Sequence, residues 1–200
     1  MVDQSPRQSP LAPVIPTTRG TGGEAGVVLG ERPFIGKINL RGNPETKEFL
    51  AAAKTVLGFD LPLEPNTVVG KGEMKALWLG PDEWLVTTPP EKDQALIDKL
   101  REGLAGVHSA VTDVGDGRST VTLAGPRARD LLAKGCGLDL HPSVFGPGRC
   151  AQSLLARVPA LIHQTDDAPS FDITVNRNIA VYLWEWLVDA AGEYGFTIEE

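Results

Sequence analysis

The sequence of 200 residues lacks most features of secreted, membrane-spanning or nucleic-acid-binding proteins. Its two cysteines, Cys136 and Cys150, are too far apart for a Cys-x-x-Cys site, so we expect reduced thiols in a cytoplasmic protein. No run approaches the ~18 apolar residues that predict a membrane span, and the start lacks the basic and apolar regions of a signal peptide. No cluster of Lys and Arg is longer than two and the net charge is −7, which disfavours nucleic acid and anionic membranes as partners.

Sequence signatures of catalysis and of metal binding are also missing. The chain contains no G-x-S-x-G elbow and no Walker A loop. The histidines, His108, His141 and His163, are scattered and form no H-x-x-x-H pair, so we expect separate solvated or core-edge side chains. The sequence therefore predicts no catalytic residue and no metal ligand in this chain.

The chain does contain one pattern of residues twice. Residues 38–62 and residues 121–142 each hold an alternating run ending in Leu-x-Gly, then Pro, a short helix pattern, and an apolar residue followed by Asp-Leu. The offset of roughly 80 residues exceeds the ~20–50-residue periods of solenoids, so the pattern predicts a duplicated supersecondary unit. Two further pairs of segments are predicted to be equivalent in the two copies: 76–86 with 153–164, and 94–104 with 179–190.

Hydrophobic periodicity and turn residues predict an α+β fold. Strands are expected at 34–40, 76–79, 84–87, 109–114, 120–124, 151–158, 160–164 and 171–175. Helices are expected at 45–57, between Pro90 and Gly106, at 127–134 and at 178–191. The order β-α-β-β-α-β, followed by most of a second copy, predicts antiparallel sheets with helices packed on them. The two quasi-repeats span about 33–115 and 118–191.

The first thirty residues differ from the rest in composition. They hold four prolines between Pro6 and Pro16 and five glycines between Gly20 and Gly30. Proline removes backbone donors and glycine raises chain entropy, so residues 1–30 are predicted to form a flexible arm. The folded domain is then expected to span residues 31–197 and to begin near Pro33.

The last predicted helix is apolar around most of its circumference. One stripe holds Trp186, and a second on another side holds Val181, Trp184 and Val188. A small domain buries one stripe easily, and Trp is a favoured interface anchor, so Trp184, Val181 and Val188 are the candidate interface with another chain. The alternative is that both stripes are buried within the chain itself.

Four separated motifs give the chain a family resemblance. They are E-R-P-F-I-G-K-I-N-L-R-G at 31–42, A-L-W-L-G-P-D-E-W-L-V at 76–86, the run from Asp116 through G-P-R-A-R-D-L-L-A-K-G-C-G-L-D-L-H-P at 116–142, and G-R-C-A-Q-S-L-L-A-R at 148–157. In this order they resemble the gamma subunit of bacterial heterotetrameric sarcosine oxidase, over essentially residues 31–195. The L-x-G-P element alone also resembles the wider aminomethyltransferase-like, folate-binding superfamily.

The resemblance implies a function that belongs to a complex. The enzyme of this family oxidatively demethylates sarcosine to glycine, passes the one-carbon unit to tetrahydrofolate and produces hydrogen peroxide. FAD, FMN, NAD and tetrahydrofolate are expected in the alpha and beta subunits, and zinc in the delta subunit. The gamma chain is expected to carry no cofactor, not to be catalytic alone, and to assemble principally with alpha. The alternatives are a free-standing folate-binding protein that transfers one-carbon units and a scaffold for another flavoenzyme.

Asp113 and Asp116 are the candidates if the chain itself binds folate. A carboxylate can accept two parallel hydrogen bonds from the 2-amino edge of a pteridine, as it does from guanidinium. The interpretation we favour is structural: Asp116 belongs to an Asp-Gly turn and Asp113 lies on an exposed strand face.

Overall fold

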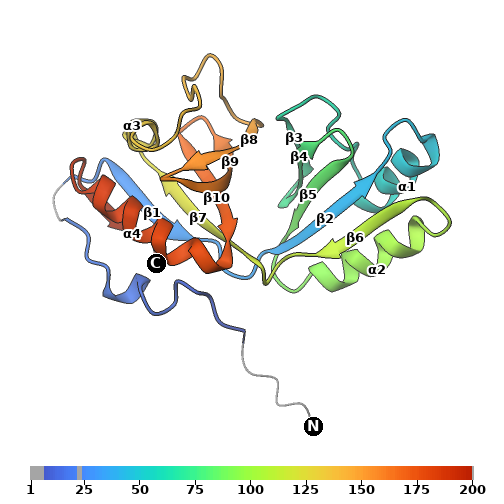
Figure 1. The fold of residues 1–200 in the computed structure, drawn as a ribbon, viewed down its shortest axis with the longest axis horizontal. Coiled ribbons are helices and arrows are strands. Elements are labelled where there is room, and N and C mark those ends of the chain that lie inside the picture. The colour runs from blue at the N-terminus through green and yellow to red at the C-terminus, as the bar shows by residue number, and fades with distance from the viewer. Residues whose placement is uncertain (1–6, 22–23, 200) are drawn as a thin grey trace, which may run out of the picture.

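Two halves of similar topology lie side by side, each built on one β-sheet (Figure 1). The computed structural model describes residues 7–21 and 24–199. The first half contains β2 (Gly36–Gly42), α1 (Lys47–Leu57), β3 (Val68–Lys71), β4 (Met74–Gly80), β5 (Glu83–Thr88), α2 (Asp93–Gly103) and β6 (Ser109–Asp113). The second half contains β7 (Arg118–Ala124), α3 (Ala128–Ala133), β8 (Cys150–Leu155), β9 (Val158–Asp166), β10 (Ser170–Asn176), the 3-10 turn η2 (Arg177–Ile179), α4 (Ala180–Ala191) and β11 (Phe196–Ile198). Both halves follow the order β-α-β-β-β-α-β, which confirms the α+β class and the duplication.

The observed repeat differs from the predicted one in its strands. The residue pattern predicted neither β3 nor β11. The sheet orders, β3-β4-β5-β2-β6 and β11-β1-β7-β10-β9-β8, make the pair β4–β5 the counterpart of β9–β10. The predicted equivalence of residues 76–86 with 153–164 is therefore wrong by one strand. Each of these two segments contains a proline, but Pro81 lies in a turn whereas Pro159 lies within β9, opposite Leu154.

Helix α1 illustrates how local sequence sets the ends of an element. Asn43 precedes it, and its side-chain oxygen accepts a hydrogen bond from the backbone N–H of Glu45 at 2.9 Å. The helix ends at Gly58, whose φ of 80° is left-handed, a conformation that glycine adopts at little cost. Its buried face consists of Phe49, Ala53 and Leu57. The periodicity predicts Phe49 and Ala53 correctly, whereas Leu50 and Val56, which it also places on this face, are half-buried.

Each half has its own hydrophobic core, and a small third cluster joins the halves. In the first half Phe49 packs against Trp84, with ring centroids 5.7 Å apart. The joining cluster consists of Leu77, Leu79, Leu85, Cys150 and Leu161. Backbone hydrogen bonds also cross the junction, from the N–H of Val68 to the carbonyl of Gly148 (2.8 Å) and from that of Cys150 to Asn66 (3.0 Å).

The folded part of the chain begins earlier than predicted. Strand β1 (Val27–Glu31) lies between β7 and β11 and pairs with both, so part of the expected arm is a central strand of the second sheet. The 3-10 turn η1 (Ile15–Thr17) precedes it, and Leu11 is completely buried in the core of the second half. The arm differs from the prediction because the rest of the chain supplies the apolar surface that it lacks. Residues 1–6 and 22–23 of the predicted arm lie outside the described residues.

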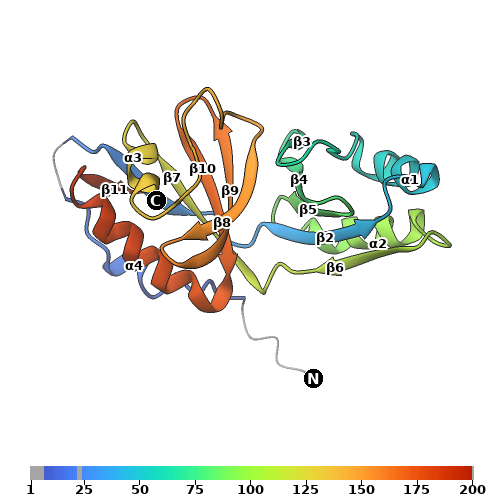
Figure 2. The ribbon, with the colours of Figure 1, turned by 45° about the horizontal axis from the view of Figure 1, so that its top comes forward.

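Helix α4 is covered by this N-terminal segment, residues 7–21. Figure 2 shows the segment running beside the helix. Trp184 is only 1% exposed, and its indole N–H donates to the hydroxyl of Thr18 at 3.0 Å. Trp184 is therefore not an exposed interface residue, which corrects the prediction, while Val181 and Val188 are half-buried against the same core. The second apolar stripe of α4 exists as predicted, but its cover comes from the same chain.

Candidate functional site

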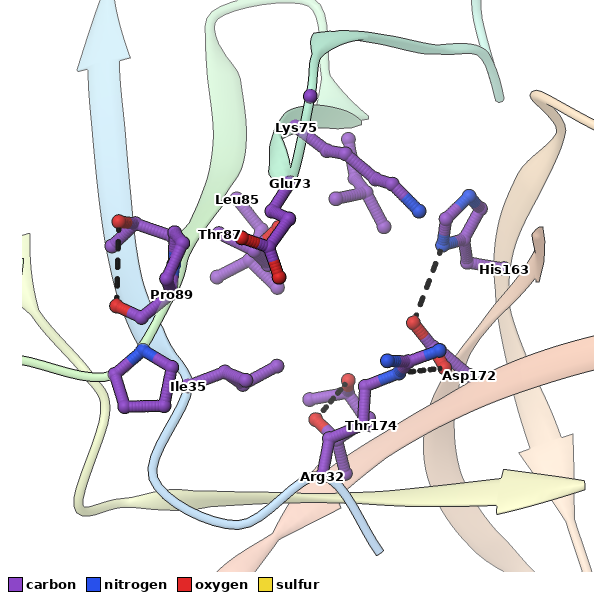
Figure 3. A pocket seen from close by; sticks show the side chains of 15 residues that line it. Arg32, Ile35, Glu73, Lys75, Leu85, Thr87, Pro89, His163, Asp172 and Thr174 are labelled. Carbon is purple, nitrogen blue, oxygen red and sulfur yellow. Dashed lines mark hydrogen bonds and ion pairs between the residues drawn. The ribbon is translucent and has the colours of Figure 1, made fainter. Parts of the chain in front are cut away.

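A cavity of about 210 Å³ lies where the two sheets meet. Figure 3 shows the side chains that line it. The first half contributes residues of β4, β5 and the turn before β4, and the second half contributes residues of β7, β9 and β10. The segments that follow β1 and β5 close the remaining sides. The charged or ionisable lining residues are Arg32, Glu73, Lys75, His163 and Asp172.

An ion pair and a histidine form the wall contributed by the second half. The Arg32 Nε lies 2.7 Å from the Asp172 Oδ1. Asp172 and His163 are register partners on β10 and β9, so both side chains stand on one face of the sheet. The His163 Nδ1 is 3.9 Å from the Asp172 Oδ2, which is beyond hydrogen-bond distance. The hydroxyls of Thr120 and Thr174 bond to each other at 2.9 Å beside them.

Burial and positive charge set the protonation state of His163. Its side chain is 5% exposed. Burial, together with the nearby cations Lys75 and Arg32, lowers the pKa of His163 to about 3. The imidazole is therefore neutral at pH 7 and offers one N–H donor and one nitrogen acceptor.

A second, smaller cavity of about 20 Å³ lies under the N-terminal segment. Lys37 is 2% exposed there, and its ammonium donates to the carbonyl of Ile35 at 3.3 Å. Burial, followed by repulsion from Arg7, lowers the pKa of Lys37 to about 8. Burial raises the pKa of Glu31, although its carboxylate accepts a hydrogen bond from Ser9 at 2.5 Å. This space has room for about one water molecule, which makes it part of the contact between segment and domain rather than a ligand pocket.

The folate candidates predicted from the sequence lie outside the larger cavity. Asp113 ends β6, and its Oδ1 accepts the backbone N–H of Gly115 at 2.8 Å, as a turn carboxylate does. Asp116 follows in the turn, and Arg7 donates to it at 2.7 Å. Neither side chain lines the space between the sheets. Asp116 therefore lies in the turn after β6 and Asp113 at the exposed end of β6, where the structural interpretation expects them.

Thiol and metal chemistry have few candidates in the described part of the chain. Cys136 and Cys150 are both free and buried, and burial raises the pKa of Cys150 to about 12. Residues 7–21 and 24–199 contain no group of three or more His, Cys, Asp or Glu side chains placed to hold a metal ion. Within the same residues, no helix is long and apolar enough to span a bilayer.

Sequence reasoning did not single out the residues that line the cavity, apart from His163. Alternation along Phe171–Val175 does place Asp172 and Thr174 on one face, which was an available signal. Arg32 and Lys75 lie far from them in sequence, and only the meeting of the two sheets brings them together.

The fold assigns the chain to a structural class. Aminomethyltransferase T of the glycine cleavage system from Bartonella henselae superposes with a TM-score of 0.63 at 18% identity, covering 88% of this chain and 48% of that chain. The fold is therefore aminomethyltransferase-like.

Sequence comparison identifies the family within that class. The profile of the sarcosine oxidase gamma subunit family matches residues 41–193. Sarcosine oxidase subunit gamma of Corynebacterium sp. (strain U-96) is 34% identical over 198 residues, 97% of this chain and 95% of that protein. A chain of heterotetrameric sarcosine oxidase from Corynebacterium sp. U-96, solved in complex with pyrrole 2-carboxylate, superposes with a TM-score of 0.87 at 33% identity, covering 94% of this chain and 96% of that chain. The chain belongs to the sarcosine oxidase gamma subunit family, as the resemblance predicts.

Proposed function

We propose that this chain is a structural, non-catalytic subunit of a heterotetrameric sarcosine oxidase. The enzyme would demethylate sarcosine oxidatively to glycine, pass the one-carbon unit to tetrahydrofolate and produce hydrogen peroxide. The observation that carries the proposal is the agreement in sequence and fold with a chain of such an enzyme along 94% of this chain. Agreement over nearly the whole length favours the same place in the same kind of assembly.

The partners and cofactors follow from the assembly. The alpha subunit would be the principal partner, with beta and delta completing a cytoplasmic heterotetramer. FAD, FMN, NAD and tetrahydrofolate would reside in alpha and beta, and zinc in delta. One property of this chain supports placing the zinc in another subunit: burial raises the pKa of the Cys150 thiol to about 12, whereas a zinc ligand has to be a thiolate.

The contact with alpha is proposed on the face formed by α4 and the N-terminal segment that covers it. Val181 and Val188 are half-buried on this helix and stay candidates. Tyr182 is 46% exposed and donates through its hydroxyl to the carbonyl of Ala156 at 2.8 Å, which fixes its ring at the surface. Amphipathic aromatic side chains held in this way are favoured at interfaces.

Copurification tests the proposed role. The tagged chain is coexpressed with the chains encoded beside it, and the captured material is assayed for subunit composition, flavin absorbance and sarcosine-dependent peroxide. We expect three further chains in equal amounts, with flavin and activity in the complex and neither in the tagged chain purified alone. A tagged chain that is recovered without partners, or that carries flavin by itself, contradicts the proposal.

The alternative, a free-standing folate-binding protein, predicts a different result. Tetrahydrofolate at 100 times its Kd would stabilise the isolated chain by about 2.7 kcal/mol and raise the melting temperature by several degrees. We expect no such shift. A shift that disappears in Asp113→Asn or Asp116→Asn would favour the alternative.

A further inference from the structure

His163 has hydrogen-bonding capacity that the described residues leave unused. Its side chain is 95% buried, and neither ring nitrogen makes a hydrogen bond to residues 7–21 or 24–199; no fully buried side-chain nitrogen or oxygen there lacks a partner, so the ring nitrogens are open to the cavity. Figure 3 shows the ring directed into the cavity, with Asp172 on one side and Lys75 on the other. Buried polar side chains are nearly always hydrogen-bonded, and the cavity is the direction from which a partner can reach this one.

The charge at this end of the cavity is positive. Arg32 and Asp172 neutralise each other at 2.7 Å. Lys75 extends toward His163 and makes no ion pair with the described residues. After burial, its charge is the next cause that lowers the pKa of His163. Glu73, the other acidic lining residue, comes from the turn between β3 and β4, and Figure 3 shows its carboxylate directed into the cavity on the side away from His163. An anion between Lys75 and His163 would accept hydrogen bonds from both.

The size and the remaining walls of the cavity favour a small organic molecule. The volume of about 210 Å³ lies below the ~300–1,000 Å³ of pockets for drug-sized ligands and suits a smaller molecule. Leu77, Leu85, Ile35 and the Pro89–Pro90 pair supply apolar surface away from His163. A ligand that fits both parts has one charged end and a short apolar body.

We propose that the cavity between the two sheets binds a small organic carboxylate, whose oxygens accept hydrogen bonds from Lys75 and His163 while its apolar part contacts the leucine and proline wall. Because Lys75 and Leu77 lie on β4 and His163 lies on β9, the ligand would bridge the two halves of the fold. The site is independent of the assembly proposed above, and its test in the full chain needs no partner subunit.

Propionate serves as the probe, and propionamide, of the same shape but without charge, is its matched control. The full chain is labelled with ¹³C at the histidine rings and titrated at constant ionic strength. We expect propionate to shift the His163 resonance saturably while those of His108 and His141 stay in place. Propionamide should bind at least about tenfold more weakly, the loss expected for charged hydrogen bonds. Equal shifts with propionate and propionamide, or with propionate and chloride, would overturn the proposal.

Two variants with the same change in charge locate the site. Lys75→Gln should weaken propionate binding about tenfold or more. Lys71→Gln, on the neighbouring exposed strand β3 and outside the cavity lining, should leave it unchanged. In the assembled complex, equilibrium dialysis with ¹⁴C-propionate should show one bound molecule fewer per complex when this chain carries Lys75→Gln. An unchanged number there, or equal effects of the two variants, contradicts the proposal.

Discussion

Helices α2 and α4 occupy equivalent places in the two halves but are covered differently. Helix α2 buries Leu96, Ile97 and Leu100 and turns its opposite face to solvent. Helix α4 buries residues on two sides, including Leu183 and Trp184. The additional cover is the N-terminal segment, which the first half lacks. A helix that is apolar on all sides therefore indicates that a second element packs against it. The pattern does not indicate whether that element belongs to the same chain or to a partner.

The strand beside the central pair also differs between the halves. In the first sheet β6 pairs antiparallel with β2. In the second sheet β1 takes that position beside β7, and β11 pairs with β1 in parallel. The described residues among the N-terminal thirty therefore extend the second copy of the unit, with β1 in its sheet and residues 7–21 over its helix.

The largest effect is expected when the side chain under the N-terminal segment is removed. Trp184→Ala should lower the free energy of unfolding by about 3–5 kcal/mol, the usual loss for a buried large aromatic side chain. Trp186→Ala should cost less, because the Trp186 side chain is only half-buried. Urea unfolding of the full chain measures both. Equal losses would mean that the segment does not seal this side of α4.

Leu11→Ala should destabilise the second half by about 2–5 kcal/mol although it lies in the predicted arm, because Leu11 is completely buried. Its control is Leu63→Ala in the first half, where the side chain is 55% exposed and the change should stay within ~0.5 kcal/mol. Limited proteolysis should also cut residues 7–21 faster in Leu11→Ala than in the unmodified chain. Rapid cleavage of both would show that the segment is a tether after all.

Mild acid should weaken the second half through His163. Its folded pKa of about 3 lies below the ordinary value of 6.5, so the unfolded chain takes up the proton first as the pH falls. The contribution of neutral His163 to the free energy of unfolding is fully present above pH 6.5 and is lost progressively toward pH 3. At pH 5 the loss is about 2 kcal/mol. Urea denaturation at a series of pH values measures how steeply the free energy of unfolding falls with pH. We expect a shallower fall in His163→Gln and an unchanged fall in His141→Gln, whose side chain is exposed. A slope unaffected by His163→Gln would assign it to other groups.

The smallest effect concerns one hydrogen bond between the segment and α4. Thr17 and Thr18 both donate to the carbonyl of Val14, but only Thr18 also accepts from Trp184. Thr18→Val should therefore lower the free energy of unfolding by about 1 kcal/mol more than Thr17→Val does, as measured by thermal melts. Equal values would show that water replaces the lost acceptor.

Much of the fold could be predicted because the longer elements carry strong periodic patterns. The apolar spacing in α1 and the alternation in β10 each indicate the type of element, and each identifies part of its buried face. The short strands β3 and β11 carry too few residues for a pattern, and their pairing depends on strands elsewhere in the chain. The proline-rich N-terminus was misread for the same reason, since Leu11 is buried by residues of the second half.

The cavity could not be predicted because its lining residues lie far apart in the sequence and form no local pattern. His163 appeared as an isolated polar residue in an apolar run, and Asp172 as one position in an alternating strand. Their neighbours Arg32 and Lys75 come from the segment after β1 and from the other half. Knowing that these four residues meet requires the register of β9 with β10 and the way in which the two sheets join.

The parallel pairing of β1 with β11 imposes an order on folding during synthesis. Val27 must wait for Phe196, its partner at the far end of the chain, while the first half from β2 to β6 is contiguous and complete much earlier. At ~5–20 residues per second the delay is on the order of ten seconds or more. Through this interval the apolar face of β1 has no complete sheet to join. The nascent chain thus carries β1 with one edge unpaired until almost its last residues have been made.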